Sequence, residues 1–172
     1  MGQPEKERAG MLTEFLVEDH RRLDGLMHAA VAHPGTIDDR AYGQFRAGLL
    51  RHIGMEEKIL LPAAQRQRGG APLPLAAKLR LDHGALASLL MPTPTAAILA
   101  TIQDILVEHN VLEEGPAGLY ETCDALAGPE GETILAVLRA APEVAVMRYN
   151  DSPAVMNAVH RALERAGYHL HA

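Results

Sequence analysis

The strongest constraint on the fold is a residue pattern that occurs twice in the chain. It reads Asp-His-x-x-Leu-x-x-Leu and then His-x-x-x-Glu-Glu, and the second copy follows the first by about 60 residues. Four imidazoles and two carboxylates in such a pseudo-symmetric set suit a pair of transition-metal ions such as iron. The candidate metal ligands are His20, His52, Glu56, His83, His109 and Glu113.

Each candidate ligand lies on the apolar face of a predicted helix. His20, for example, follows Leu16 by four residues and precedes Leu23 by three. Residues four apart lie about 6 Å apart along a helix axis, so a His and a Glu at that spacing can reach one metal cluster. A buried carboxylate without a partner is costly, and a metal ion removes that cost. Any one of these histidines alone can equally be a structural core residue, and a third His-x-x-x-Glu, beginning at His160, has no matching parts.

The hydrophobic periodicity predicts an all-α fold. Apolar residues at helical spacing predict helices over residues 9–32, 37–67, 75–90 and 96–126. Pro62 is expected to bend or loosen the second helix without ending it, and Pro116 lies at a similar place in the fourth. Short connections between long helices predict an up-down-up-down four-helix bundle over residues 9–128.

Residues 129–172 differ from the preceding residues in their hydrophobic pattern and are expected to form a small appendage. The pattern predicts a short helix over 132–140, a strand over 143–149, a helix over 153–165 and a closing strand over 168–171. A sheet of two strands is barely stable alone. We therefore expect a strand-helix-strand segment that packs on the bundle or mediates a homodimer.

Composition limits the function classes. The chain has 172 residues, enough for one domain with a core, and its net charge of −6 argues against a nucleic-acid partner. No apolar run approaches the roughly 20 residues of a membrane span, and residues 1–8 lack the apolar core of a secretory signal. With one cysteine, Cys123, no internal disulfide is possible, and a reducing cytoplasm is expected.

Four acidic residues flank the candidate ligands. Asp19 and Asp82 directly precede a candidate histidine, and we expect them to face solvent or to cap a helix, or alternatively to orient a histidine. Glu57 and Glu114 directly follow the candidate glutamates, and we expect them on the surface, or alternatively as spare ligands.

Three further residues are expected to have structural roles only. Tyr42 and Tyr120 lie two to three turns from the candidate ligands along their helices, and we expect them to pack in the core. Cys123 is expected to be a small buried residue.

The stretches EDHRRLDGLM, HIGMEEKILLPA, LDHGALASLL and HNVLEEGP resemble the hemerythrin-like family of HHE cation-binding proteins, from about Met11 to Leu126. The resemblance implies a non-haem di-iron centre with an oxo or hydroxo bridge, held in a four-helix bundle. It implies that the four histidines are terminal iron ligands and that Glu56 and Glu113 bridge the two ions. Zn or Mn remain alternative occupants.

One departure from the family pattern bears on function. Oxygen-carrying members have a further histidine where this chain has Ala87, so one metal has a ligand fewer. The resemblance implies binding of O₂ or NO for sensing, scavenging or carriage. The alternative is a di-iron enzyme or iron donor, acting in NO or peroxide reduction or in iron–sulfur cluster repair. A third interpretation is a helical interaction protein with a structural metal.

Overall fold

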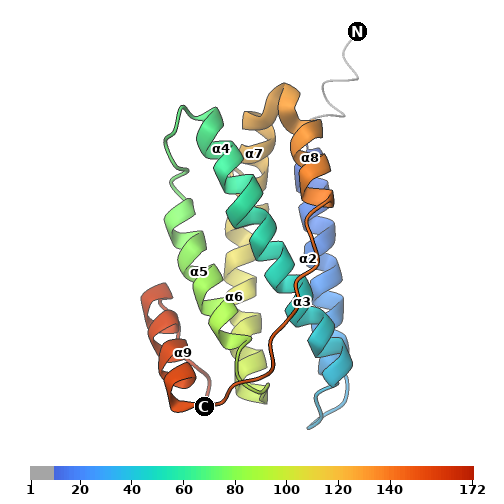
Figure 1. Cartoon of the computed structure of the whole chain (residues 1–172), viewed down its shortest axis with the longest axis vertical. Helices are drawn as coiled ribbons and strands as arrows, with labels where there is room; N and C mark the ends of the chain where they lie inside the picture. The colour runs from blue at the N-terminus through green and yellow to red at the C-terminus, as the bar shows by residue number, and fades with distance from the viewer. Residues whose placement is uncertain (1–9) are drawn as a thin grey trace.

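The structure, a computed structural model, describes residues 10–172 and is helical with no strand in that range. Residue 9, the predicted start of the bundle, and residues 1–8, where no secretory signal is expected, lie outside the described residues. In Figure 1, α2, α3 with α4, α5, and α6 with α7 lie side by side along the long axis. The elements are α2 (Met11–Ala30), α3 (Asp39–Met55), η1 (Glu56–Leu60), α4 (Leu61–Gln67), α5 (Ala76–Leu89), α6 (Ala96–Glu114), α7 (Leu119–Ala127), η2 (Gly128–Glu130), α8 (Gly131–Arg139) and α9 (Pro153–Ala166).

Pro62 loosens its helix without ending it, as predicted. The chain continues from α3 through η1, a π-helical turn, into α4. Proline lacks an N–H and its ring clashes with the carbonyl four residues earlier, and a wider turn accommodates both effects. The helix begins with Asp38, whose carboxylate accepts a hydrogen bond from the Ala41 N–H at 2.8 Å. The candidate ligand Glu56 lies at the start of the wide turn.

The single helix predicted over residues 96–126 is wrong, because the chain breaks between α6 and α7. Gly115 is extended, Pro116 follows it, and Ala117 has a φ of 56°. Gly118 allows a close backbone approach: a Cβ there would lie 2.7–2.8 Å from three main-chain carbonyl oxygens. The break interrupts the helical register between Glu113 and Tyr120.

The C-terminal segment contains no strand, so the predicted strands over 143–149 and 168–171 are wrong. The chain between α8 and α9 is an extended strap that runs along the bundle (Figure 1). No neighbouring strand lies beside it to form a ladder, and its hydrogen bonds go to the bundle instead. Arg46 donates to the Met147 carbonyl at 3.2 Å, and the Asn150 N–H donates to the Met91 carbonyl at 2.9 Å.

The helix predicted over 153–165 forms as α9 and packs on the bundle. Gly167, with a φ of 91°, ends it as a left-handed cap. Val159 and Leu163 are buried in the same apolar cluster as Leu89 of α5. The C-terminal appendage was expected either to pack on the bundle or to mediate a homodimer. This contact confirms that it packs on the bundle.

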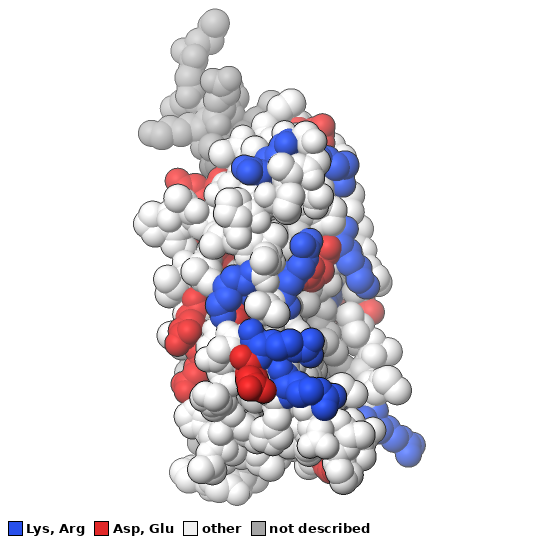
Figure 2. All heavy atoms as spheres, turned by 90° about the vertical axis from the view of Figure 1, so that its left-hand side faces the viewer, with Lys and Arg blue, Asp and Glu red and all other residues white. Residues whose placement is uncertain are grey.

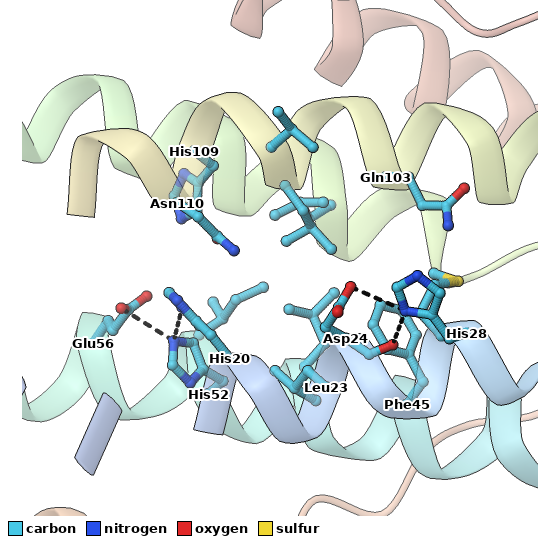
Figure 3. A pocket seen from close by; sticks show the side chains of 16 residues that line it. His20, Leu23, Asp24, His28, Phe45, His52, Glu56, Gln103, His109 and Asn110 are labelled. Atoms are coloured by element: carbon cyan, nitrogen blue, oxygen red, sulfur yellow. Dashed lines mark hydrogen bonds and ion pairs between the residues drawn. The ribbon is translucent and has the colours of Figure 1, made fainter. Parts of the chain in front are cut away.

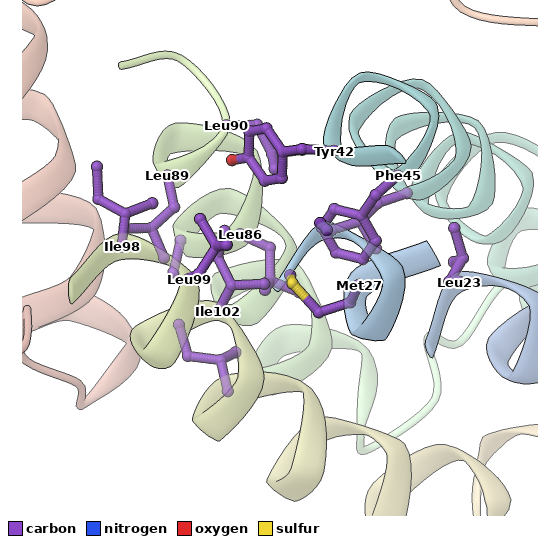
Figure 4. Close-up of a cluster of buried hydrophobic side chains, with 14 of the residues drawn as sticks. Leu23, Met27, Tyr42, Phe45, Leu86, Leu89, Leu90, Ile98, Leu99 and Ile102 are labelled. Atoms are coloured by element: carbon purple, nitrogen blue, oxygen red, sulfur yellow. The ribbon is translucent and has the colours of Figure 1, made fainter. Parts of the chain in front are cut away.

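The apolar core consists of two clusters. Between them lies a polar layer of buried side chains that includes the six candidate metal ligands. Figure 4 shows the first cluster, where Met27, Phe45, Leu86 and Ile102 meet from four helices. The second cluster lies toward the other end of the bundle and includes Leu16 of α2. Burying one large apolar side chain contributes about 1.5–3 kcal/mol, so the two clusters hold the helices together on both sides of the polar layer.

No helix within residues 10–172 is long and apolar enough to cross a membrane. On the face that carries α5 and α9, Lys and Arg side chains gather with acidic side chains among them (Figure 2). Two cations of α5 are paired: Lys78 contacts Asp82 at 2.5 Å and Arg80 contacts Glu57 at 3.1 Å. Both acidic partners belong to the polar layer.

Candidate metal centre

All six candidate ligands converge in the polar layer between the two apolar clusters. They form two overlapping groups that share both carboxylates, and the ligand atoms within each group lie within 4.8 Å of one another. One group holds His20 and His52, and the other holds His83 and His109. All six residues are buried. Ala87 is half-buried and belongs to neither group, so each group has two imidazoles and two shared carboxylates.

The imidazoles are arranged as metal ligands would be. Nε2 of His20 lies 2.9 Å from Nε2 of His52, and Nε2 of His83 lies 3.2 Å from Nε2 of His109. Each ring directs its Nδ1 at a carboxylate, which can only accept, so in a neutral ring Nε2 carries the lone pair. Two facing lone pairs need a cation between them. Nitrogens bound at about 2.0–2.1 Å to one metal ion and at right angles are about 2.9 Å apart.

The shared carboxylates also have free ligand atoms. Oε2 of Glu56 and Oε1 of Glu113 are buried and have no hydrogen-bond partner within residues 10–172. Histidine Nε2 atoms lie 3.0 Å and 2.9 Å from them, but without hydrogen-bond geometry. A buried polar atom without a partner is rare in proteins, and a metal ion supplies the missing partner. The donor set therefore fits two cations bridged by the two carboxylates.

The outer ring nitrogens are held by four further carboxylates, two from the Asp of each Asp-His pair and two from the second Glu of each Glu-Glu pair. Asp19 holds Nδ1 of His52 at 2.8 Å, and Asp82 holds Nδ1 of His109 at 3.2 Å. Such contacts fix the ring orientation and raise its basicity as a ligand. The expectation that Asp19 and Asp82 face solvent or cap helices is wrong, and the alternative, that they orient histidines, describes the structure.

The two remaining contacts come from Glu57 and Glu114. Glu57 holds Nδ1 of His83 at 2.7 Å, and Glu114 holds Nδ1 of His20 at 2.5 Å. Their side chains are 25% and 35% exposed, so they lie at the rim of the centre, and neither is a spare ligand in either group. The doubled pattern thus places each histidine against a carboxylate from another helical segment, which explains the adjacent acidic residues.

Three of these four outer carboxylates also pair with a lysine or arginine side chain. Arg22 contacts Asp19 at 2.8 Å, which complements the Lys78–Asp82 and Arg80–Glu57 pairs described above. The layer therefore carries six carboxylates against three fixed cations. The excess negative charge favours the binding of positively charged ions.

The pKa values express the same electrostatic preference. Burial alone would lower the pKa of His52, but the charge of Glu56 and the hydrogen bond to Asp19 raise it to about 10. The pKa of His83 is raised to about 11 and that of His109 to about 9 because carboxylates outweigh burial there too. In return, the histidines hold the pKa of Glu113 well below its usual range despite burial. The site stabilises positive charge.

Tyr120 is a residue of the candidate centre that the sequence analysis missed. Its hydroxyl lies in the centre, 2.6 Å from Glu56, 3.1 Å from Glu113 and 2.9 Å from Nε2 of His20. The expectation of simple core packing assumed a continuous helix. The break at Gly115–Gly118 interrupts the helical register, so the position of Tyr120 relative to Glu113 is not that of a continuous helix. Burial and the two carboxylates raise the pKa of the phenol well above its usual value, so it stays protonated as a donor.

Fold and site together define an all-helical protein with a buried cation-binding centre built from paired His and Glu residues. A family model described as hemerythrin HHE cation binding domain matches residues 11–117. The chain belongs to this family. Tyr120 lies just beyond the matched range. Neither a curated protein nor a solved structure was found to match the chain.

Proposed function

We propose that this protein holds two iron ions at the candidate metal centre and uses them to bind O₂ or NO, for sensing, scavenging or carriage. The observation that carries the proposal is the sharing of Glu56 and Glu113 by two groups, each with a facing pair of histidine Nε2 atoms. Imidazole ligands suit iron, although they also suit zinc. The family of the chain supports iron over zinc or manganese.

Each residue of the centre has a role in this proposal. The four histidines are terminal ligands, and the two shared carboxylates bridge the ions. The iron ions supply the open coordination position and the electrons by which a diatomic molecule is held. Because Ala87 stands where a further histidine would be, each group offers two imidazoles, and the two ions would have nearly equivalent protein ligands.

The proposal is tested by exposing the reduced, iron-loaded protein to air and then removing the oxygen. We expect a visible charge-transfer band that appears in air and disappears under argon over several cycles. Oxidation in one irreversible step would contradict reversible O₂ binding. The NO form is tested in the same way, with NO added and removed by purging.

The Tyr120 hydroxyl favours a second candidate function, reduction of NO or peroxide by a di-iron enzyme. The phenol lies 2.6 Å from Glu56 among the candidate ligands, and reduction of either molecule consumes protons as well as electrons from an external reductant. Turnover well above that of free iron, retained in Tyr42→Phe and reduced in Tyr120→Phe, would support the enzyme. Delivery of iron to damaged iron–sulfur clusters is tested by transfer of labelled iron.

Several expectations remain part of the proposal. They are the up-down-up-down order of the helices, a domain boundary near residue 128, a cytoplasmic location and the absence of nucleic-acid or membrane partners. A homodimer through the C-terminal segment is also proposed only, and sedimentation tests it.

A further inference from the structure

A cavity of about 260 Å³ leads from the metal centre toward the surface. It lies between α2 and α6, with α3 as its floor (Figure 3). His20, His52 and His109 form its inner end. Asp24 and Gln103 line its outer end, where both are at least partly exposed.

The cavity is larger than a diatomic ligand needs. Its volume of about 260 Å³ far exceeds the roughly 10–15 Å³ that a single water needs on the same kind of measure. Apolar cavities of about 150 Å³ already bind benzene. Between Asn110 and Gln103 the rise of α6 is about 10 Å, which an extended chain of about eight bonds spans.

The walls between the two ends are apolar. Phe45 and Leu49 of α3 form one wall, and Leu23 of α2 and Leu106 of α6 form others. Water forms few hydrogen bonds with such walls, so it is favourable for an apolar group to fill the space between them. A hydrocarbon chain fits this part of the cavity.

The inner end carries a polar group that lacks a partner. Asn110 lines the cavity beside His109, and its Oδ1 is buried with no hydrogen-bond partner among residues 10–172. Figure 3 shows its side chain extending from α6 toward His20, with the amide nitrogen at its tip. An amide N–H that reaches the cavity beside the candidate metal ligands is suited to an oxygen acceptor on a molecule bound there.

We propose that the cavity binds an unbranched aliphatic molecule of about six to eight carbons with an oxygen-bearing head group. The head group lies at the candidate metal centre and accepts a hydrogen bond from the Asn110 side-chain amide, and the chain lies along Leu106 and Phe45 toward Gln103. Alcohols, carboxylic acids and alkyl hydroperoxides share this chemistry. The placement of the head group rests on the proposed di-iron centre, whereas the placement of the chain rests on the walls alone.

Calorimetric titration of the iron-loaded protein with 1-butanol, 1-hexanol and 1-octanol tests the proposal. Each added CH₂ should lower the Kd about fourfold until the chain reaches the outer end. A Kd independent of chain length would overturn it. Octanoate and octyl hydroperoxide, titrated in parallel, distinguish the three head groups by which binds most tightly.

Two variants locate the binding. Leu106→Trp fills the cavity and should abolish the gain from chain length, while Val111→Trp, on the same helix and 67% exposed, should leave it unchanged. Asn110→Leu should weaken all three alcohols about tenfold and keep the chain-length dependence. Equal effects of the two Trp variants would contradict a chain in this cavity.

Iron analysis of the same samples separates this inference from the proposed function. Two irons per chain without dependence on chain length would overturn the cavity inference alone. A chain-length dependence in protein that holds no iron would overturn the di-iron proposal and the placement of the head group, and would support the apolar part of the cavity.

Discussion

The Tyr120 hydroxyl donates a hydrogen bond of 2.6 Å to the Glu56 carboxylate, across 64 residues of sequence. The contact joins α7 to the π-helical turn η1. Two departures from regular α-helix accompany this contact. The helix widens into the π-helical turn before Pro62, and the last long helix breaks at Pro116. The two departures together bring a phenol into the layer of candidate metal ligands.

Removing this hydroxyl should destabilise the metal-free protein. Tyr120→Phe leaves Glu56 and Glu113 with one donor fewer in a buried site, so the free energy of unfolding should fall by about 1–3 kcal/mol. Tyr42→Phe is the matched control, because the buried Tyr42 hydroxyl has no hydrogen-bond partner in the described part of the chain and its loss should be neutral or stabilising. Urea unfolding of both variants measures the difference. Equal stabilities would contradict the assigned role of Tyr120.

The outer carboxylates should set the metal affinity. Asp82→Asn weakens the contact that orients His109, and the affinity for iron should fall about 10- to 100-fold. Glu18→Gln is the control, since Glu18 forms only an exposed pair with Arg21 and should not change the affinity. Competition with a chelator of known affinity measures both. An unchanged affinity in Asp82→Asn would show that the contact has no influence on the metal.

The helix break should depend on Gly118. In Gly118→Ala the new Cβ meets main-chain oxygens at 2.7–2.8 Å, and rigid backbone cannot yield as a side-chain end can, so a loss of about 1–3 kcal/mol is expected. Gly25→Ala is the control in the interior of α2, where nothing lies within 4 Å, and it should stabilise by about 0.5–1 kcal/mol. Thermal unfolding compares the two. Opposite signs are expected, and a neutral Gly118→Ala would contradict the described turn.

The Cys123 thiol should be unreactive in the folded protein. Burial raises its pKa from 9.0 to about 12, so at pH 8 the folded protein has about a thousandfold less thiolate than the unfolded chain. The stabilisation from a protonated thiol is complete below pH 9 and is lost as the pH rises through about 12. Alkylation rates with and without denaturant at pH 7–9 measure this. Comparable rates in the two conditions would contradict the burial of this thiol.

Local sequence patterns were enough to predict much of the helical fold. The apolar spacing in residues 9–32 and 75–90 corresponds to α2 and α5, and Ser152 and Gly167 mark the ends of α9. The convergence of the six candidate ligands also followed from the doubled pattern, because periodicity places all of them on apolar faces.

The errors came from contacts between distant segments. The alternation over 143–149 resembles a strand, but a strand needs a neighbour, and the strap finds Arg46 and Met91 instead. Tyr120 could not be placed from helical spacing because Gly115–Gly118 interrupt the helix. The roles of Asp19 and Glu57 depend on neighbouring helices, although their presence in both copies of the pattern was a signal for them.

Metal content tests the central claim most directly. Protein purified from iron-supplemented cells should contain two irons per chain with absorption typical of a bridged ferric pair, and His52→Ala/His109→Ala should lose both ions. His52→Ala alone should lose one, because His83 and His109 remain with the shared carboxylates. Wild-type protein without iron, or a metal content that these substitutions leave unchanged, would contradict a di-iron centre at these residues.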